Sequence, residues 1–377
     1  MSRGNVTCAL IMLRIAAVAG LGLVCPVTGL AVDTAAVEPV ERFKERFPEV
    51  REFVVSDFLI QGNERTKSFV IHREMPIGQG DTLSTQNLSA RLEKAEKQLL
   101  NSRLFNEVRL VPVWLSKGRA RLIIGVEERW YTFPAPIFKL ADRNFNEWLV
   151  NRNADLSRTS YGARLYQENI RGRNEQLQLV AQTGFNQDYG LYYKIPYLDS
   201  ASRTGLRFGA SYSRSHQTAY SAKNQSLQFF KEEDKYVKKQ FDAQVRLIHR
   251  PTIDISHRAE VEFQSNWVAE PIIQRNAAYY EGERQIQRFL RLRYQYQRDY
   301  RDRVNYPTEG YLLKMEALQW GIGAFEGPST TAINGSYQQF EKLGDRWTIA
   351  TKIAGRYSLP GDQPFSIEKG FGYGKIF

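Results

Sequence analysis

The sequence predicts a mainly β protein, in which a transmembrane antiparallel β-barrel follows one small α+β domain. After residue 158 the chain repeats runs of about ten to fifteen residues that alternate apolar and polar side chains, as membrane-crossing strands do. Between residues 51 and 128, strand patterns are instead interrupted by apolar residues at helical spacing. The mean hydropathy of −0.47 is compatible with a barrel, because lumen-facing polar residues offset lipid-facing apolar ones.

The N-terminal residues 1–31 have the features of a secretory signal peptide. Arg3 lies near the start, Ile15–Val24 is mostly apolar, and Gly29–Ala31 offers small residues for cleavage. Both cysteines, Cys8 and Cys25, precede that site, so the mature chain is expected to contain no disulfide and no cysteine-bound metal. A lipid anchor on Cys25 is less favoured, because the residues before it form a poor lipobox.

A linker over residues 32–50 leads into the α+β domain, predicted over residues 51–128. Its expected elements are a strand over Phe53–Ile60, a helix over Thr66–Glu74, a helix from Ser84 or Thr85 to about Asn101, and strands over Phe105–Trp114 and Ala120–Glu127. The second helix would bury one face, made of Leu88, Leu92, Ala95 and Leu99. The order is therefore β-α-α-β-β.

This order carries a resemblance to a known family. Together with the phrases Ile60-Gln61-Gly62-Asn63 and Leu104-Phe105-Asn106-Glu107-Val108, it resembles a POTRA domain. POTRA domains are periplasmic modules of the BamA/TamA-type outer-membrane assembly family. The resemblance implies that the remainder, residues 129–377, is an outer-membrane β-barrel.

About eleven or twelve alternating strands are expected after Trp130, each long enough to cross a bilayer when tilted. The clearest of these strands runs from Gln285 to Asp299. One of its sides carries Ile286, Leu290, Leu292, Tyr294 and Tyr296, together with Arg288 and Arg298. The opposite side is polar except for Phe289. Further strands are expected over residues 174–185, 204–214, 258–267 and 347–357. A polar second face suits either bulk water or a barrel lumen, and the strand length favours the lumen.

The segment from Asp299 to Gly310 contains a motif. Pro307 fixes φ and lacks an N–H, and Gly310 permits an unusual backbone where the next strand begins. The residues alone indicate an ordinary hairpin turn. The set Asp299, Pro307, Thr308 and Gly310 also resembles the barrel signature of the same family, as do the segments Trp130–Pro136, Asp142–Trp148 and Asn169–Glu175.

The resemblance implies a protein that inserts outer-membrane proteins or moves polypeptides across the outer membrane of a Gram-negative bacterium. The physical basis is strand addition to an exposed sheet edge. The expected client-binding edge in the periplasmic POTRA domain is Phe105, Asn106, Glu107, Val108, Arg109, Leu110 and Val111. A second edge is expected at the seam of the barrel. Expected partners are nascent or unfolded outer-membrane polypeptides, outer-membrane lipid and accessory lipoproteins.

The C-terminal residues Gly370–Phe377 resemble the lead-in to the Arg-Gly-Tyr/Phe motif of the family, and the motif itself does not follow. The resemblance therefore implies an incomplete barrel, with about eleven or twelve of an expected sixteen strands. A truncated gene product, a fragment, or a barrel completed by another chain are the options, in that order.

Other classes of function have little support in the sequence. The net charge of +11 is scattered along the strands and accompanies no zinc-finger spacing or basic helix, so no nucleic-acid partner is expected. His72, His216, His249 and His257 lack metal-ligand spacing, although the last two could meet across a hairpin. No G-x-S-x-G elbow occurs. No catalytic residue, metal or cofactor is therefore expected. The alternatives to an insertase are a passive pore, a secretion-system translocator and a non-functional truncated paralogue.

Overall fold

The computed structural model describes residues 50–140, 147–151, 155–199, 201–223, 226–322, 325, 327–344, 346–360 and 363–367. The expected signal peptide, nearly all of the linker, most of the segment Asp142–Trp148 and the segment Gly370–Phe377 lie outside the described residues.

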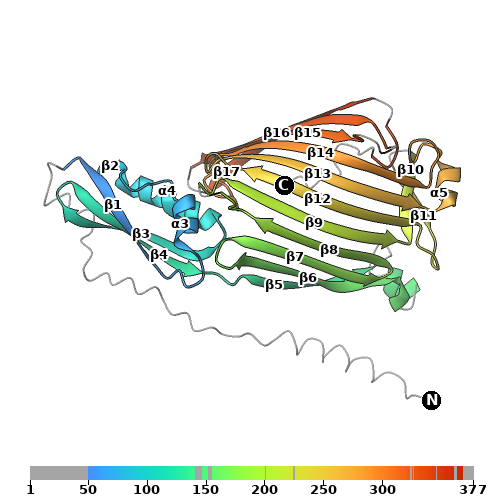
Figure 1. The fold of residues 1–377 in the computed structure, drawn as a ribbon, viewed down its shortest axis with the longest axis horizontal. Helices are drawn as coiled ribbons and strands as arrows, with labels where there is room; N and C mark the ends of the chain where they lie inside the picture. Colours follow the sequence, from blue (N-terminus) through green and yellow to red (C-terminus); the bar gives the residue numbers. More distant parts are fainter. Residues whose placement is uncertain are drawn as a thin grey trace, which may run out of the picture. The chain divides into compact units, whose positions relative to one another are not determined.

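Residues 52–128 form the α+β domain (Figure 1). Its elements are β1 (Glu52–Gln61), α3 (Ser68–Glu74), β2 (Thr82–Ser84), α4 (Leu88–Asn101), β3 (Phe105–Ser116) and β4 (Arg119–Glu128). The four strands lie in the order β2-β1-β4-β3, with β1 parallel to β4 and the other pairs antiparallel. The predicted helix face is buried as expected, because Leu88, Leu92, Ala95 and Leu99 pack into the domain core.

The start of the second helix differs from the expectation. Ser84 belongs to the short strand β2, and α4 begins at Leu88 after Asn87, whose side chain makes no capping hydrogen bond. Thr85 instead donates its hydroxyl to the carbonyl oxygen of Val50 at 3.1 Å. Side chains with capping ability also bind other nearby backbone groups, and here the Thr85 hydroxyl binds carbonyl oxygens of the two residues before β1.

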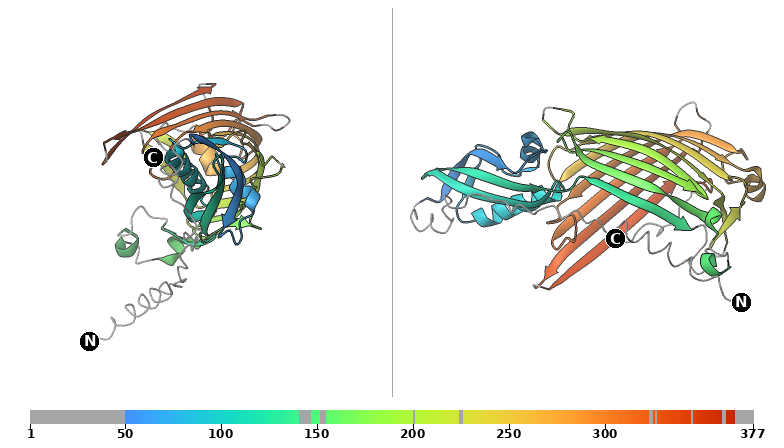
Figure 2. Two further views of the ribbon diagram at one scale, coloured as in Figure 1. Left: turned by 90° about the vertical axis from the view of Figure 1, so that its left-hand side faces the viewer. Right: turned by 90° about the horizontal axis from the view of Figure 1, so that it is seen from below.

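Residues 132–359 form a large antiparallel sheet of eleven strands, which Figure 2 shows to be strongly curved. Its strands are β5 (Thr132–Leu140), β6 (Thr159–Ile170), β7 (Glu175–Gly184), β8 (Asn186–Ile195), β9 (Thr204–Ser215), β12 (Lys238–His249), β13 (Ile255–Val268), β14 (Ile286–Asp299), β15 (Gly310–Trp320), β16 (Thr330–Leu343) and β17 (Trp347–Leu359). Each pairs with the next in this order, so the sheet is a meander. Its size and its resemblance to part of a barrel confirm the predicted fold class.

Three smaller features accompany the sheet. The hairpin β10 (Gln217–Lys223) and β11 (Ser226–Lys231) forms a separate pair, and α5 (Glu270–Arg275) follows β13. Among the described residues, β5 and β17 each pair with one neighbour and form the two edges of the large sheet. No helix in the part of the chain that the structure describes is long and apolar enough to cross a membrane.

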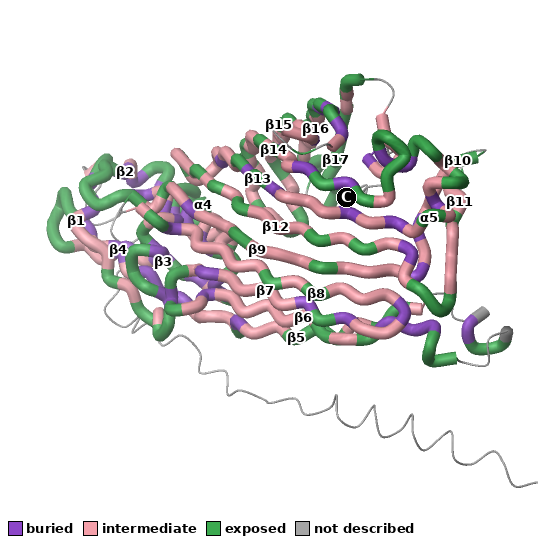
Figure 3. The backbone as a smooth tube through the Cα atoms, turned by 45° about the vertical axis from the view of Figure 1, so that its right-hand side comes forward, coloured by how far each residue is buried: buried purple, intermediate pink, exposed green. Residues whose placement is uncertain are grey.

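In the large sheet the apolar face is exposed and the polar face is the more buried one, which is the reverse of a soluble sheet. On β14, Leu292 and Tyr294 are 40% and 48% exposed, whereas Gln287 on the other side is buried. The apolar face continues over the neighbouring strands, where Val245, Val261, Met315 and Ile333 are about half exposed. Figure 3 accordingly shows buried residues concentrated in the α+β domain and few along the middle of the large sheet. A broad exposed apolar face with a polar inner face is typical of a membrane barrel.

The one apolar residue of the polar face is explained by its surroundings. Phe289 is 2% exposed and packs with Leu318, Trp320, Ala332 and Ile367 on the inner side of the sheet. A small apolar cluster therefore lies among the polar inner side chains, with Ile367 reaching it from outside the strands.

Candidate functional site

The strand β3 lies at an edge of the four-stranded sheet, because β4 is its one neighbour among the described residues. The expected client-binding residues from Phe105 to Val111 all lie on it. Phe105, Val108 and Leu110 face the core, and Asn106 and Arg109 are exposed. Arg109 Nε donates to Glu107 Oε1 at 2.6 Å. This edge therefore offers backbone groups beside an exposed ion pair.

A buried carboxylate ties the α+β domain to the large sheet. Glu74, the last residue of α3, is 4% exposed. Arg250 donates to its two carboxylate oxygens at 2.7 and 3.1 Å, and the Tyr197 hydroxyl donates to Oε1 at 3.0 Å. Arg250 follows β12 and Tyr197 follows β8, so one side chain joins a helix to two turns of the sheet. We call this group the Glu74 junction.

The electrostatics of the Glu74 junction follow from burial and charge. Burial opposes ionisation of Glu74, but the charge and hydrogen bonds of Arg250 outweigh it and hold the pKa of Glu74 below its ordinary value of 4.5. Burial and the neighbouring Glu74 charge raise the pKa of the Tyr197 hydroxyl, so it remains a donor. Arg73 adds a second link by donating to the carbonyl oxygens of Ser202 and Arg250 at 2.7 and 2.8 Å.

The turn between β6 and β7 forms another contact with the α+β domain. The Lys67 N–H donates to the carbonyl oxygen of Gly172 at 2.9 Å, and Asn169 Nδ2 donates to Thr66 Oγ1 at 2.8 Å. Gly172 has a φ of +71°, and a Cβ there would lie 1.9 Å from the carbonyl oxygen of Arg65. Glycine therefore permits this close approach of two backbones. The segment Asn169–Glu175, singled out in the sequence, thus contributes to the contact between the two parts.

The turn between β14 and β15, residues 300–309, holds the sequence motif. The carboxylate of Asp302 accepts hydrogen bonds from the N–H and hydroxyl of Thr308, both at 2.9 Å, and from the N–H of Glu309 at 3.2 Å. Burial opposes ionisation of Asp302, but these bonds outweigh it and lower its pKa. Asp299, which the sequence pattern selected, instead forms a bidentate pair with Arg301. The pattern missed Asp302, whose spacing of six residues before Thr308 is the signal that could have identified it.

The motif turn also contacts the helix that leads into β3. Asn101, the last residue of α4, donates to the carbonyl oxygen of Asp302 at 3.3 Å and accepts from the Val304 N–H at 3.1 Å. Arg103 Nη2 donates to Asn305 Oδ1 at 3.3 Å. The motif therefore supports the end of the α+β domain from which β3 starts.

Gly310 permits the tight end of this turn. Its φ is +98°, and a Cβ would lie 2.1 Å from the carbonyl oxygen of Tyr300. We expect Gly310→Ala to lower the free energy of unfolding by about 1–3 kcal/mol. Gly335→Ala is the matched control, because a Cβ at Gly335 in β16 meets no atom within 4 Å. Urea unfolding of the detergent-solubilised protein measures the free energy of unfolding of both variants. Equal losses in the two would show that the turn accommodates a side chain at residue 310 without strain.

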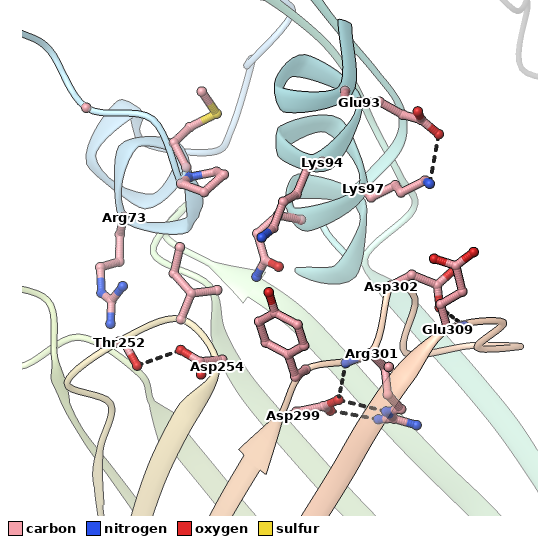
Figure 4. Close-up of a pocket in the computed structure, with 18 residues that line it drawn as sticks. Arg73, Glu93, Lys94, Lys97, Thr252, Asp254, Asp299, Arg301, Asp302 and Glu309 are labelled. Atoms are coloured by element: carbon pink, nitrogen blue, oxygen red, sulfur yellow. Dashed lines mark hydrogen bonds and ion pairs between the residues drawn. The ribbon is translucent and has the colours of Figure 1, made fainter. Parts of the chain in front are cut away.

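A cavity of about 740 Å³ lies between α4 and the turns that follow β12 and β14 (Figure 4). Lys94 lies over the ring of Tyr300, 5.4 Å from its centroid. Figure 4 shows that the polar groups on the sheet side pair with one another: Thr252 donates to Asp254 at 2.7 Å, and Asp299 binds Arg301. The cavity is thus bounded by charges of both signs.

A network of charges lies on the inner face of the large sheet. The carboxylate of Glu260 in β13 is 1% exposed, accepts from Arg246 Nε at 2.6 Å and lies 3.4 Å from Arg293 Nη1. Arg291 binds Glu262, and Arg293 also contacts Glu316 at 3.2 Å. The network joins β12, β13, β14 and β15. The periodicity of the sequence placed these residues on the polar face, but it did not predict which of them pair with one another.

His249 and His257, which the sequence allowed to meet across a hairpin, pair across β12 and β13 with ring centroids 6.4 Å apart. His257 Nδ1 lies 2.7 Å from the Tyr294 hydroxyl. Within the described residues, no three histidine, cysteine, aspartate or glutamate side chains are grouped so that they could hold a metal ion.

In comparisons with known protein families, each of the two parts of the chain matches a different family profile. The profile of the Omp85 superfamily domain matches residues 169–374, more than half of the 377 residues. The POTRA profile, described as a surface antigen variable number repeat, matches residues 53–129. No curated protein matches the sequence.

Several solved structures are similar. A crystal structure of BamA from Haemophilus ducreyi lacking POTRA domains 1-3 has 16% identity and a TM-score of 0.46, with 83% of this chain and 57% of that chain covered. CdiB from Acinetobacter baumannii has 12% identity and a TM-score of 0.44, with 83% and 54% covered. CdiB from Escherichia coli has 10% identity and a TM-score of 0.47, with 84% and 56% covered. The chain thus spans a little over half the length of these structures.

Proposed function

The chain belongs to the Omp85 superfamily, and from this premise we propose that it assists the insertion or translocation of polypeptides at the outer membrane of a Gram-negative bacterium. The observation that carries the proposal is the edge strand β3 of the POTRA-matching domain, tied by the Glu74 junction to the turns of a barrel-like sheet. A client strand added to this edge would be held beside the sheet that it is to join or cross. Strand addition needs no catalytic side chain, in agreement with the non-enzymatic character of the family.

The large sheet is proposed to span the membrane, with the α+β domain in the periplasm. The support is the exposed apolar outer face, which would contact lipid, and the charged inner face, which would line the lumen. In this arrangement the turns that contact the α+β domain are the periplasmic turns. Lipid and accessory lipoproteins remain part of the proposal as partners. The domain boundaries proposed are residues 51–128 for the POTRA domain and 129–377 for the barrel.

A pair of substitutions tests the membrane assignment. Val261 lies in the middle of β13 on the outer face, and Gln264 lies nearby on the inner face. We expect Val261→Arg to destabilise the folded protein in lipid vesicles by about 2–4 kcal/mol, and Gln264→Arg to have a much smaller effect. Reversible urea unfolding in vesicles measures the difference. If both variants were equally stable, the outer face would not contact lipid.

Site-specific crosslinking tests the client-binding edge. The sequence has two cysteines, both before residue 31, so a cysteine introduced by Arg109→Cys can carry a photoreactive group selectively once the signal is cleaved. The probe is a radiolabelled nascent outer-membrane barrel protein added to outer-membrane vesicles. We expect an adduct at Arg109→Cys and none at the control Arg91→Cys, which is exposed on α4. Equal labelling of both positions would contradict the proposal.

Conductance together with the same crosslinking experiment distinguishes an insertase from a passive pore. A pore would conduct steadily in planar bilayers and would give no client adduct at Arg109→Cys. A secretion translocator would give adducts with secreted clients and none with nascent barrel proteins. The identity of the adducted client thus decides between insertion and secretion.

A further inference from the structure

The backbone donors of the β3 edge are unequally available. In a strand, the N–H and C=O of one residue point to the same side, and those of the next residue point to the other. The Leu110 N–H does not point toward β4, because it donates to Glu96 Oε1 of α4 at 2.7 Å. The register of β3 with β4 is regular from Glu107 to Trp114. The backbone groups of Val108, Leu110 and Pro112 therefore all face the open side of the sheet.

Two of these three positions offer no donor to a client. The Leu110 N–H is bound by the Glu96 carboxylate, and Pro112 has no N–H. Proline is tolerated in a sheet where its nitrogen faces an open edge, which agrees with the place of Pro112 in β3. This leaves Val108 as the position whose N–H a client strand would meet first.

We propose that Glu96 is a latch on the client-binding edge of β3: a client strand extends its pairing past Val108 only by displacing the Glu96 carboxylate from the Leu110 N–H. This inference rests on the proposed function of β3 as a client-binding edge. Pro112 then ends the ladder, because a client carbonyl opposite it finds no donor. The partner that fits is a short extended segment paired over residues 106–111, held briefly and released, rather than a strand added permanently along the whole edge.

The surroundings of Glu96 make the latch displaceable. Glu96 is half-buried on α4, and its burial raises its pKa although the Leu110 N–H acts in the opposite direction. A carboxylate held in this position loses part of its hydration and recovers it on moving into water. Arg109, exposed beside Leu110 on β3, is paired with Glu107 in the latched state. The hydrogen bond to Leu110 is therefore an interaction that a client N–H···O=C pair can replace.

The experiment measures binding of a defined strand to the full chain in detergent micelles. The probe is a synthetic fluorescent peptide with the sequence of β14, Ile286–Asp299, which alternates as a barrel strand does. We expect Glu96→Ala to bind it about tenfold more tightly than the unchanged chain, because the Leu110 N–H becomes available. Glu96→Gln retains a neutral acceptor and should fall between the two. Glu93→Ala is the matched control, since Glu93 lies one turn earlier on α4 and pairs with Lys97 at 2.8 Å.

A second variant acts on the edge without changing α4. Pro112→Val adds an N–H on the open side and should also tighten peptide binding, even if Glu96→Ala fails to fold. Equal peptide affinities in the unchanged chain and in folded Glu96→Ala, with crosslinking retained at Arg109→Cys, would overturn the latch and leave the client-binding edge intact, and an unchanged affinity in Pro112→Val would overturn the role of Pro112 in ending the ladder. Absence of any peptide crosslink at Arg109→Cys in every variant would overturn the edge itself, and with it the proposed function.

Discussion

Glu74→Ala is expected to release the α+β domain from the turns of the large sheet that it contacts. The substitution removes the acceptor of two Arg250 bonds and one Tyr197 bond and leaves the partly buried Arg250 guanidinium without its carboxylate partner. Loss of one partner of a buried ion pair typically costs about 3–5 kcal/mol, and here the loss falls on the free energy of docking between the two parts. The large sheet itself should remain folded, because its strand pairing does not involve Glu74.

Limited proteolysis measures this release. Arg129 lies between β4 and β5 and is paired with Glu168 at 3.1 Å, so trypsin should cut there at least about tenfold faster in Glu74→Ala. Glu64→Ala is the control, because Glu64 is exposed on the same domain just before α3. The double variant Glu74→Ala/Arg250→Ala should lose less docking free energy than the two single variants lose together, since neither charge then remains without its partner. Additive losses would show that the two residues act independently.

The same junction predicts a dependence on acidity. The pKa of Glu74 is lowered in the folded state, so its contribution to docking is complete above its ordinary pKa of 4.5 and disappears as the pH falls through the lower folded value. Cleavage of the segment between β4 and β5 by a protease that is active in acid should therefore accelerate below about pH 4.5 in the unchanged chain. In Glu74→Gln the acceleration should be absent.

Glu260→Gln is expected to have the second large effect, on the stability of the barrel-like sheet. The buried Glu260 carboxylate faces three guanidinium groups, those of Arg246, Arg291 and Arg293. A neutral amide leaves these cations close together without the central negative charge. We expect a loss of about 3 kcal/mol in the free energy of unfolding, measured by urea unfolding in lipid vesicles.

Two further variants separate the network from a general effect of losing charge. Glu341→Gln changes an exposed residue of β16 and should have little effect. Adding Arg246→Met to Glu260→Gln removes the guanidinium group that Glu260 binds most closely and should recover part of the lost stability. A Glu260→Gln protein as stable as the unchanged chain would mean that water on the inner face of the sheet screens the cluster.

Individual elements show what the sequence could predict. The face of α4 was identified from Leu88, Leu92, Ala95 and Leu99, because a period of 3.6 residues is visible without knowledge of any neighbour. The start of the same helix was misplaced at Ser84 or Thr85, since the choice between capping a helix and binding the backbone near β1 depends on where β1 lies. In the β14–β15 turn, Thr308 and Gly310 were selected, but Asp302, the partner of Thr308, was not.

The sequence by itself determined the alternation of β14, the two helices and three longer strands of the α+β domain, and the family, since periodicity and local motifs are written in neighbouring residues. Only the tertiary structure decided which residues meet. Glu74 and Arg250 are 176 residues apart, and no local pattern connects them. Likewise, the β3 edge followed from the sequence, whereas its occupation by Glu96 depends on how α4 packs beside that strand. The physical reason is that an ion pair or a hydrogen bond acts within a few ångströms in space, and the fold alone sets those distances.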